Sequence, residues 1–123
     1  HLKELIAILI SCSDNFVVVL DNDPEGRSSY NTYKHYYKDS FVKRCYQYDG
    51  VSKSGHDFRL EDILSPEDNE RIKTEVGCND IKNAIVSLFF MEDEKKAQII
   101  NGIDSVTRRN IEIITRKIHA IMG

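Results

Sequence analysis

Hydrophobic residues recur with helical spacing near both ends of the chain and through much of its second half. One amphipathic helix is predicted over residues 2–12, from the spacing of Leu2, Leu5, Ile6, Leu9 and Ile10. Four more are predicted over residues 66–76, 81–90, 94–101 and 105–122, the last with Ile111, Ile114, Ile118 and Ile121 on one face. Ser65 and Pro66 have the pattern of an N-cap followed by proline at the first helical position.

Two segments have the pattern of strands. The continuous apolar run from Phe16 to Leu20 predicts a central parallel strand covered on both faces, and Pro24 and Gly26 end it. A helix is expected from about residue 25 to 38, with Tyr30, Tyr33 and Tyr37 packed on the sheet. Residues 41–48 alternate in polarity and predict a second, less buried strand near the sheet edge, and residues 49–57 a loop.

This order predicts an α/β fold, in which a small parallel sheet flanked by helices is followed by a helical C-terminal extension. We expect the sheet-bearing domain over residues 1–64 and the extension, packed on it, over residues 65–123.

Composition narrows the class of protein. The chain is 41% hydrophobic and 30% charged, which is typical of a globular protein, and no apolar run has the length of a membrane span. Its net charge of -3 argues against a basic nucleic-acid clamp, although metal ions can supply positive charge at a phosphate. Three widely spaced cysteines predict neither structural zinc nor a disulfide framework, so a reducing cytoplasm is expected.

Asp21 and Asp23 follow the apolar run directly, where α/β sheets place ligands. In an extended segment residues two apart point to the same side, so both carboxylates can face one point and bind Mg²⁺ or Mn²⁺. We expect them to converge on a solvent-accessible pocket. The alternative is a polar turn in which Asp23 caps the next helix.

Residues 17–27, Val-Val-Val-Leu-Asp-Asn-Asp-Pro-Glu-Gly-Arg, resemble the Asp-x-Asp strand of Toprim domains, and in particular the Toprim half of OLD-family (overcoming lysogenization defect) ATP-dependent nucleases. The segment from Leu60 to Glu67 is similar to a Glu-Asp-Leu segment of that family. Residues 105–111 resemble a C-terminal helix start commonly written Thr-x-x-Asn-Phe.

The resemblance implies a Toprim-type DNA endonuclease in which Asp21, Asp23 and Glu61 are the catalytic, metal-binding carboxylates, with Asp62 as a less certain neighbour. It also implies a role in phage defence, an upstream ATPase domain in the same parent protein and, as an open expectation, a homo-oligomer. The family's first strand, with its catalytic glutamate, and its GxxxxGK[ST] motif do not occur in this sequence. Residues 1–64 are therefore expected to be a partial Toprim domain of a C-terminal fragment.

Other candidates have simpler explanations. Lys117 matches a phosphate-side lysine of the family or is an exposed helix cation. His35 and His56 lack partners at metal-ligand spacing, so both are expected at the surface. Lys43 and Arg44 could contact phosphates or be solvated edge-strand charges, and the tyrosines at 30, 33, 36 and 37 could stack on bases. A second class of function stays open, a non-catalytic binding or regulatory domain with a structural acidic turn.

Overall fold

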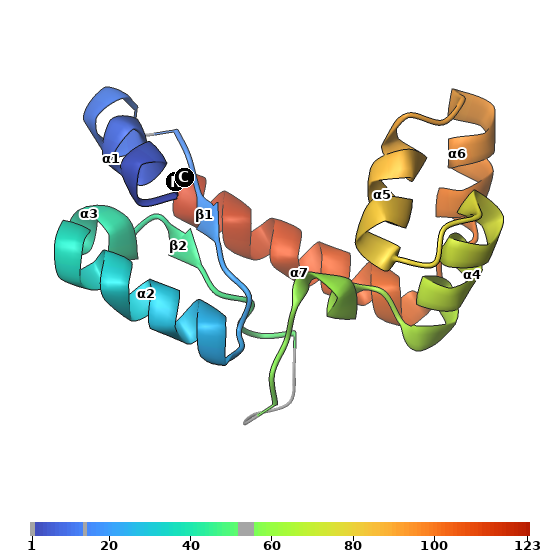
Figure 1. The fold of residues 1–123 in the computed structure, drawn as a ribbon, viewed down its shortest axis with the longest axis horizontal. Helices are drawn as coiled ribbons and strands as arrows, with labels where there is room; N and C mark the ends of the chain where they lie inside the picture. Colours follow the sequence, from blue (N-terminus) through green and yellow to red (C-terminus); the bar gives the residue numbers. More distant parts are fainter. Residues whose placement is uncertain (1, 14, 52–55) are drawn as a thin grey trace. The chain divides into compact units, whose positions relative to one another are not determined.

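The computed structural model describes residues 2–13, 15–51 and 56–123 (Figure 1). The protein is a mixed α/β chain, mostly helical with one small parallel sheet. Its contacts divide it into two compact units, which we call unit 1 (residues 1–59 and 113–123) and unit 2 (residues 60–112). The two units are defined by contacts and not by domain boundaries, so the division into domains 1–64 and 65–123 stays a prediction.

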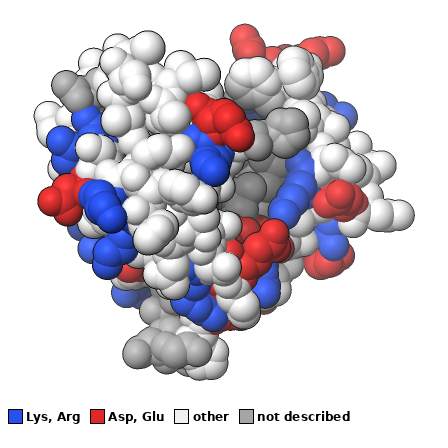
Figure 2. Space-filling model, turned by 60° about the vertical axis from the view of Figure 1, so that its left-hand side comes forward, with Lys and Arg blue, Asp and Glu red and all other residues white. Residues whose placement is uncertain are grey.

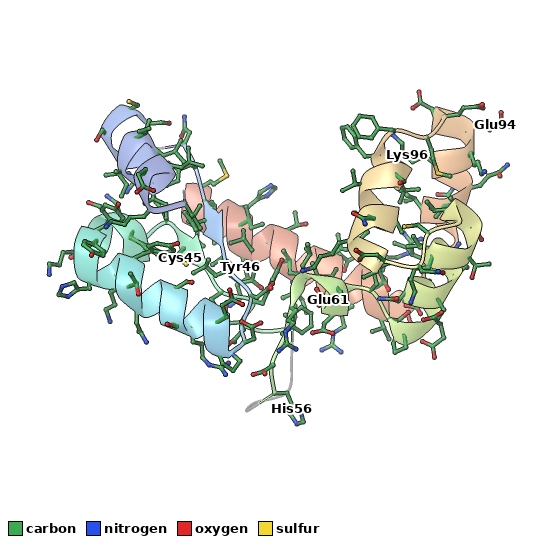
Figure 3. All side chains as sticks on the ribbon, in the orientation of Figure 1. Cys45, Tyr46, His56, Glu61, Glu94 and Lys96 are labelled. Atoms are coloured by element: carbon green, nitrogen blue, oxygen red, sulfur yellow. The ribbon has the colours of Figure 1, made fainter. Side chains whose placement is uncertain are left out.

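Unit 1 holds the sheet. Its elements are α1 (Leu2–Cys12), β1 (Val18–Val19), α2 (Pro24–Tyr37), α3 (Asp39–Val42), β2 (Cys45–Tyr46) and the end of α7 (Ser105–Met122). Strands β1 and β2 are parallel, with Val18 opposite Cys45 and Val19 opposite Tyr46. Cys45 and Tyr46 are labelled in Figure 3.

The core of unit 1 forms where α1, α2 and α3 meet β1. Ile6, Val18, Leu20 and Phe41 are buried together, and Tyr30 and Tyr33 pack against them. The Phe41 ring lies 5.6 Å from the Tyr30 ring and 5.5 Å from the Tyr33 ring, between ring centroids. Packing of the α2 tyrosines is therefore confirmed, and it anchors the helix that follows β1.

Both predicted strands differ from the structure in detail. β1 is shorter than residues 16–20. Among the described residues it pairs with the single strand β2, and Val19 is 39% exposed, so the expectation of a central strand covered on both faces was wrong. Phe41 is helical, not the first residue of a strand, because its side chain enters the core from α3. Arg44, Tyr46 and Tyr48 are buried, so the second strand is not the less buried one.

Unit 2 consists of helices. After the 3-10 turn η1 (Leu60–Ile63) come α4 (Pro66–Val76), α5 (Ile81–Phe89), α6 (Asp93–Asn101) and the start of α7. Ile72, Ala84 and Ile99 form its core. The Ser65 side chain accepts a hydrogen bond from Asp68 N, so the predicted N-cap is confirmed, and the predicted helices occur within a residue of their expected bounds.

The predicted apolar face of α7 is only partly buried. Ile114 is buried, Ile118 and Ile121 are half-buried, and Ile111 is 42% exposed. Within residues 2–13, 15–51 and 56–123, no helix has the length and apolar character needed to cross a membrane.

Candidate functional site

The candidate site is the segment Asp21-Asn22-Asp23, which links β1 to α2. Leu20 N donates to Tyr46 O at 2.9 Å, and the Gln47 side chain donates to Asp21 O at 3.0 Å. One residue later, Asn22 forms an antiparallel bridge with Phe58, with N–O distances of 2.7 and 2.8 Å. The segment is therefore held at its backbone on two sides, at the carboxyl end of a parallel strand.

Asp23 is the N-cap of α2. Its backbone is extended, Pro24 follows at the first helical position, and Asp23 Oδ1 accepts from Gly26 N at 2.7 Å. This hydrogen bond is the main reason why the pKa of Asp23 lies below its ordinary value, and the Arg59 guanidinium lowers it further. Asp23 is only 8% exposed, so it is less accessible to solvent than the sequence suggested.

Gly26 brings the first turn of α2 against the peptide of Asp21. A Cβ atom at this position would lie 1.8 Å from Asp21 O and 2.8 Å from Asp21 C, both backbone atoms. No side chain fits there without moving either the helix or the segment. The glycine of the Gly-Arg pair therefore sets how closely α2 approaches the two aspartates.

Two arginines join the acidic segment to the chain near Asp57. Arg59 Nε lies 2.9 Å from Asp23 Oδ2, and the other end of its guanidinium is 3.7 Å from Asp57. Arg27 donates to the Asn22 side chain at 3.0 Å and to Asp57 at 3.1 Å. Sequence reasoning missed Asp57 and Arg59, since no local spacing connects them with a turn more than thirty residues earlier.

Asp21 is half-buried and has a different environment from Asp23. Its carbonyl oxygen accepts from Gln47 and lies against Gly26, so its backbone is fixed from both sides. Asp21 and Asp23 thus leave the same strand two residues apart. Asp23 has a clear structural role, and the alternative of a helix-capping turn is confirmed for that residue.

Glu61 lies in unit 2, on η1 (Figure 3). Its Oε2 is 3.9 Å from Lys82 Nζ and is buried without a hydrogen-bond partner, while its side chain as a whole is 31% exposed. Its neighbour Asp62 is exposed. A carboxylate oxygen in such a position retains its capacity to accept a bond or to bind a cation.

The donor chemistry suits a hard divalent cation, although the ligand set is small. Asp21 and Asp23 supply carboxylate oxygens, the ligands that Mg²⁺ and Mn²⁺ prefer. The Asp23 oxygens already accept from Gly26 N and Arg59, but each carboxylate oxygen has a second lone pair. In the part of the chain that the structure describes, no three His, Cys, Asp or Glu side chains gather as a metal site requires.

The remaining candidates take other positions. Lys117 Nζ pairs with Asp49 Oδ2 at 3.1 Å. Arg44 is buried, donates to Ser40 O and stacks on the Phe16 ring at 5.1 Å, so it is not a solvated edge-strand charge. His35 and His56 are exposed as expected, and Figure 3 shows His56 pointing away from the ribbon.

A buried polar cluster in unit 2 was not predicted. Thr107, fully buried, accepts from Ser65 N at 2.9 Å and donates to Asp68 Oδ2 at 2.6 Å. Asp104 accepts from Thr107 N and from the Ser65 hydroxyl, and its own N donates to Asp68. The cluster joins the first turns of α4 and α7, and its bonds are internal. We therefore regard it as structural.

Asn110 makes a further link of the same kind. Its side chain donates to Ile63 O at 3.1 Å and is largely buried. The segments around Leu60–Glu67 and residues 105–111, which carried the weaker parts of the resemblance, therefore meet in unit 2. Their polar residues satisfy backbone groups between them, which is a structural role.

Comparison with protein-family models finds no family that matches this chain, and comparisons with curated proteins and with solved structures find no match either.

Proposed function

We propose that unit 1 carries the site of a divalent-metal-dependent DNA endonuclease of the Toprim kind, with Asp21 and Asp23 as ligands of Mg²⁺ or Mn²⁺. One observation carries the proposal. Two carboxylates leave the carboxyl end of a parallel strand in a segment fixed by Gln47, Phe58 and the first turn of α2. Parallel α/β sheets bind ligands at this place.

The residues at and near this site have different roles in the proposal. Asp21 and Asp23, both in unit 1, bind and orient the cation, whereas Glu61 is assigned to the ligand set by the resemblance alone and belongs to unit 2. Arg27 and Arg59 keep positive charge beside the carboxylates, where it offsets the charge of a DNA phosphate. A bound divalent cation supplies activation of water and stabilisation of the leaving oxygen.

The wider parts of the proposal come from the resemblance. We propose a cytoplasmic phage-defence protein in which this chain works beside an upstream ATPase domain, with homo-oligomers as an open expectation. Support lies in the motif of residues 17–27 and in its position at the strand end.

A second candidate function is a non-catalytic binding domain with a structural acidic turn. The observation that favours it is specific to Asp23. Both of its oxygens are engaged, one by Gly26 N and the other by Arg59, as in a helix cap with an ion pair. Asp21 therefore distinguishes the two candidates better than Asp23 does.

The test is a calorimetric titration of the 123-residue chain with Mn²⁺, comparing the unsubstituted chain with Asp21→Asn. The proposal expects weak binding that the substitution abolishes. Glu94→Gln, an exposed carboxylate on α6, is the matched control and should bind as the unsubstituted chain does. Equal binding by Asp21→Asn, or no binding at all, would favour the structural turn.

Activity gives an independent readout in the intact parent protein. Nicking of a supercoiled plasmid in Mn²⁺ should fall by at least about a hundredfold in Asp21→Asn, since loss of a metal ligand costs several kcal/mol of barrier. Parental nicking rates in a normally folded variant would contradict the proposal.

A further inference from the structure

The exposed face of α2 forms a shallow groove that starts beside the candidate site. One hollow of about 660 Å³ is lined by residues that recur every three or four positions, among them Arg27, Ser28, Asn31, Thr32, His35 and Tyr36. A second hollow of about 360 Å³ is lined by Asn31, Lys34, His35, Lys38, Asp39 and Val42, with two cations and one carboxylate among them. The two share Asn31 and His35, so they continue into one another along the helix.

The charge of this part of the chain is opposite to that of the whole. Between residues 24 and 44 there are five Lys or Arg and two Asp or Glu, whereas the complete chain has a net charge of -3. Lys34 and Lys38 are exposed on the groove, and Arg27 is half-exposed at its start. Figure 2 brings the left-hand side of Figure 1 forward and shows Lys and Arg side chains spaced over its left part, among uncharged side chains and some acidic ones.

The other groups in the groove are suited to a nucleic acid. Ser28 and Asn31 are exposed and can donate hydrogen bonds to phosphate oxygens, while the Thr32 hydroxyl donates to Ser28 O at 3.1 Å. Tyr36 is 53% exposed and can stack on a base, and Lys3 Nζ lies 4.2 Å from the centre of its ring. An acidic peptide would pair with the cations but would leave the aromatic surface without a planar partner.

We propose that this groove binds the backbone of single-stranded DNA and directs it toward Asp21 and Asp23. From Arg27 to Tyr37, the last residue of α2, the helix rises about 15 Å, which corresponds to about four nucleotides of a strand. Pro24 lines the same hollow and follows Asp23 directly, so a strand in the groove ends beside the carboxylates. The choice of DNA over another polyanion rests on the proposed function.

The test measures binding without metal, so that it does not depend on cleavage. A short fluorescein-labelled DNA single strand is titrated with the 123-residue chain in EDTA, and anisotropy is followed at several salt concentrations. With three phosphate contacts, from Arg27, Lys34 and Lys38, the slope of log affinity against log salt should be about -2. The double variant Lys34→Gln, Lys38→Gln should reduce it to about -0.7 and weaken binding about tenfold.

The control is Lys95→Gln, Arg109→Gln, which changes the net charge equally at two exposed residues of unit 2. It should keep the slope of the unsubstituted chain. Lys34→Gln alone gives an intermediate slope and guards against misfolding of the double variant, which a melt also checks. Equal slopes in the double variant and the control, or no DNA binding, overturn the proposal.

Two further outcomes separate this inference from the proposed function. The first compares two competitors at equal charge, polyglutamate and unlabelled DNA. If both displace the labelled DNA equally well, the groove is a general polyanion surface and the choice of DNA is overturned. DNA binding that depends on Lys34 and Lys38 supports the groove even where Asp21→Asn leaves Mn²⁺ binding unchanged. In that case the nuclease proposal fails and the groove remains.

Discussion

The guanidinium of Arg59 closes on the carboxylate of Asp23, with 2.9 Å between Nε and Oδ2. The same carboxylate caps α2 through Gly26 N. A residue at the end of a strand thus holds the start of a helix and a distant arginine together, and its removal should affect both stability and any metal chemistry.

Asp23→Asn and Asp23→Ala should separate these roles. Asparagine keeps an oxygen that accepts from Gly26 N, because Asn is as good an N-cap as Asp, whereas alanine has none. Asparagine cannot also accept from Arg59, so we expect Asp23→Asn to melt between the unsubstituted chain and Asp23→Ala, and Asp23→Ala to melt lower by roughly 4 °C, measured by circular dichroism. Equal melting of both variants would show that the cap contributes little.

Gly26→Ala should destabilise unit 1 strongly. The added Cβ would lie 1.8 Å from Asp21 O, and backbone on both sides prevents an easy shift. We expect a loss of at least about 2 kcal/mol in the free energy of unfolding, from urea denaturation. Ser28→Ala, two residues later on the exposed face of α2, is the control and should change the free energy of unfolding by no more than about 0.5 kcal/mol.

Thr107→Val should destabilise unit 2 by about 2 kcal/mol. Valine has nearly the same shape, but it leaves Ser65 N without its acceptor and removes one of the two hydrogen bonds that the buried Asp68 Oδ2 accepts. Thr74→Val provides the comparison, since its hydroxyl bonds Glu70 O at an exposed site. Urea midpoints of the two variants that differ by no more than experimental error would contradict the view of the cluster as a structural core.

Acid should weaken unit 2 through Asp104. The Ser65 hydroxyl, and next the Thr107 N–H, hold the pKa of Asp104 below its ordinary value. A carboxyl whose folded pKa is depressed contributes stability that is present above its unfolded pKa, about 3.9, and is lost as pH falls through the folded value. Melting curves should therefore show less loss of stability below about pH 4 in Asp104→Asn than in the unsubstituted chain.

The helices were the part of the fold most open to prediction. Ser65 and Pro66 carry their start signal locally, and the spacing of the tyrosines in α2 shows which face is buried. The strand predicted from Phe41 begins only at Cys45, because alternating polarity over a short segment does not show where a helical turn ends and a strand starts. The helical turn at Phe41 depends on the packing of the Phe41 ring against Tyr30 and Tyr33, which is a tertiary contact.

Prediction of the candidate site was limited in the same way, because the sequence shows the end of the strand but not the tertiary contacts made there. An apolar run that ends in Asp21 and Pro24 places the carboxylates at a strand end without any knowledge of the fold. The engagement of Asp23 by Arg59 could not be foreseen, because it depends on how the chain returns to pair Phe58 with Asn22. Burial of Arg44 against Phe16 is likewise a product of packing between strands and helices.

The contact of Gly26 with the Asp21 carbonyl has a mechanical consequence. The first turn of α2 is in close contact with the end of β1, since the gap is too small even for a methyl group. A displacement that pushes the first turn of α2 toward the end of β1 therefore meets the Asp21 peptide at once, so this end of the helix resists compression.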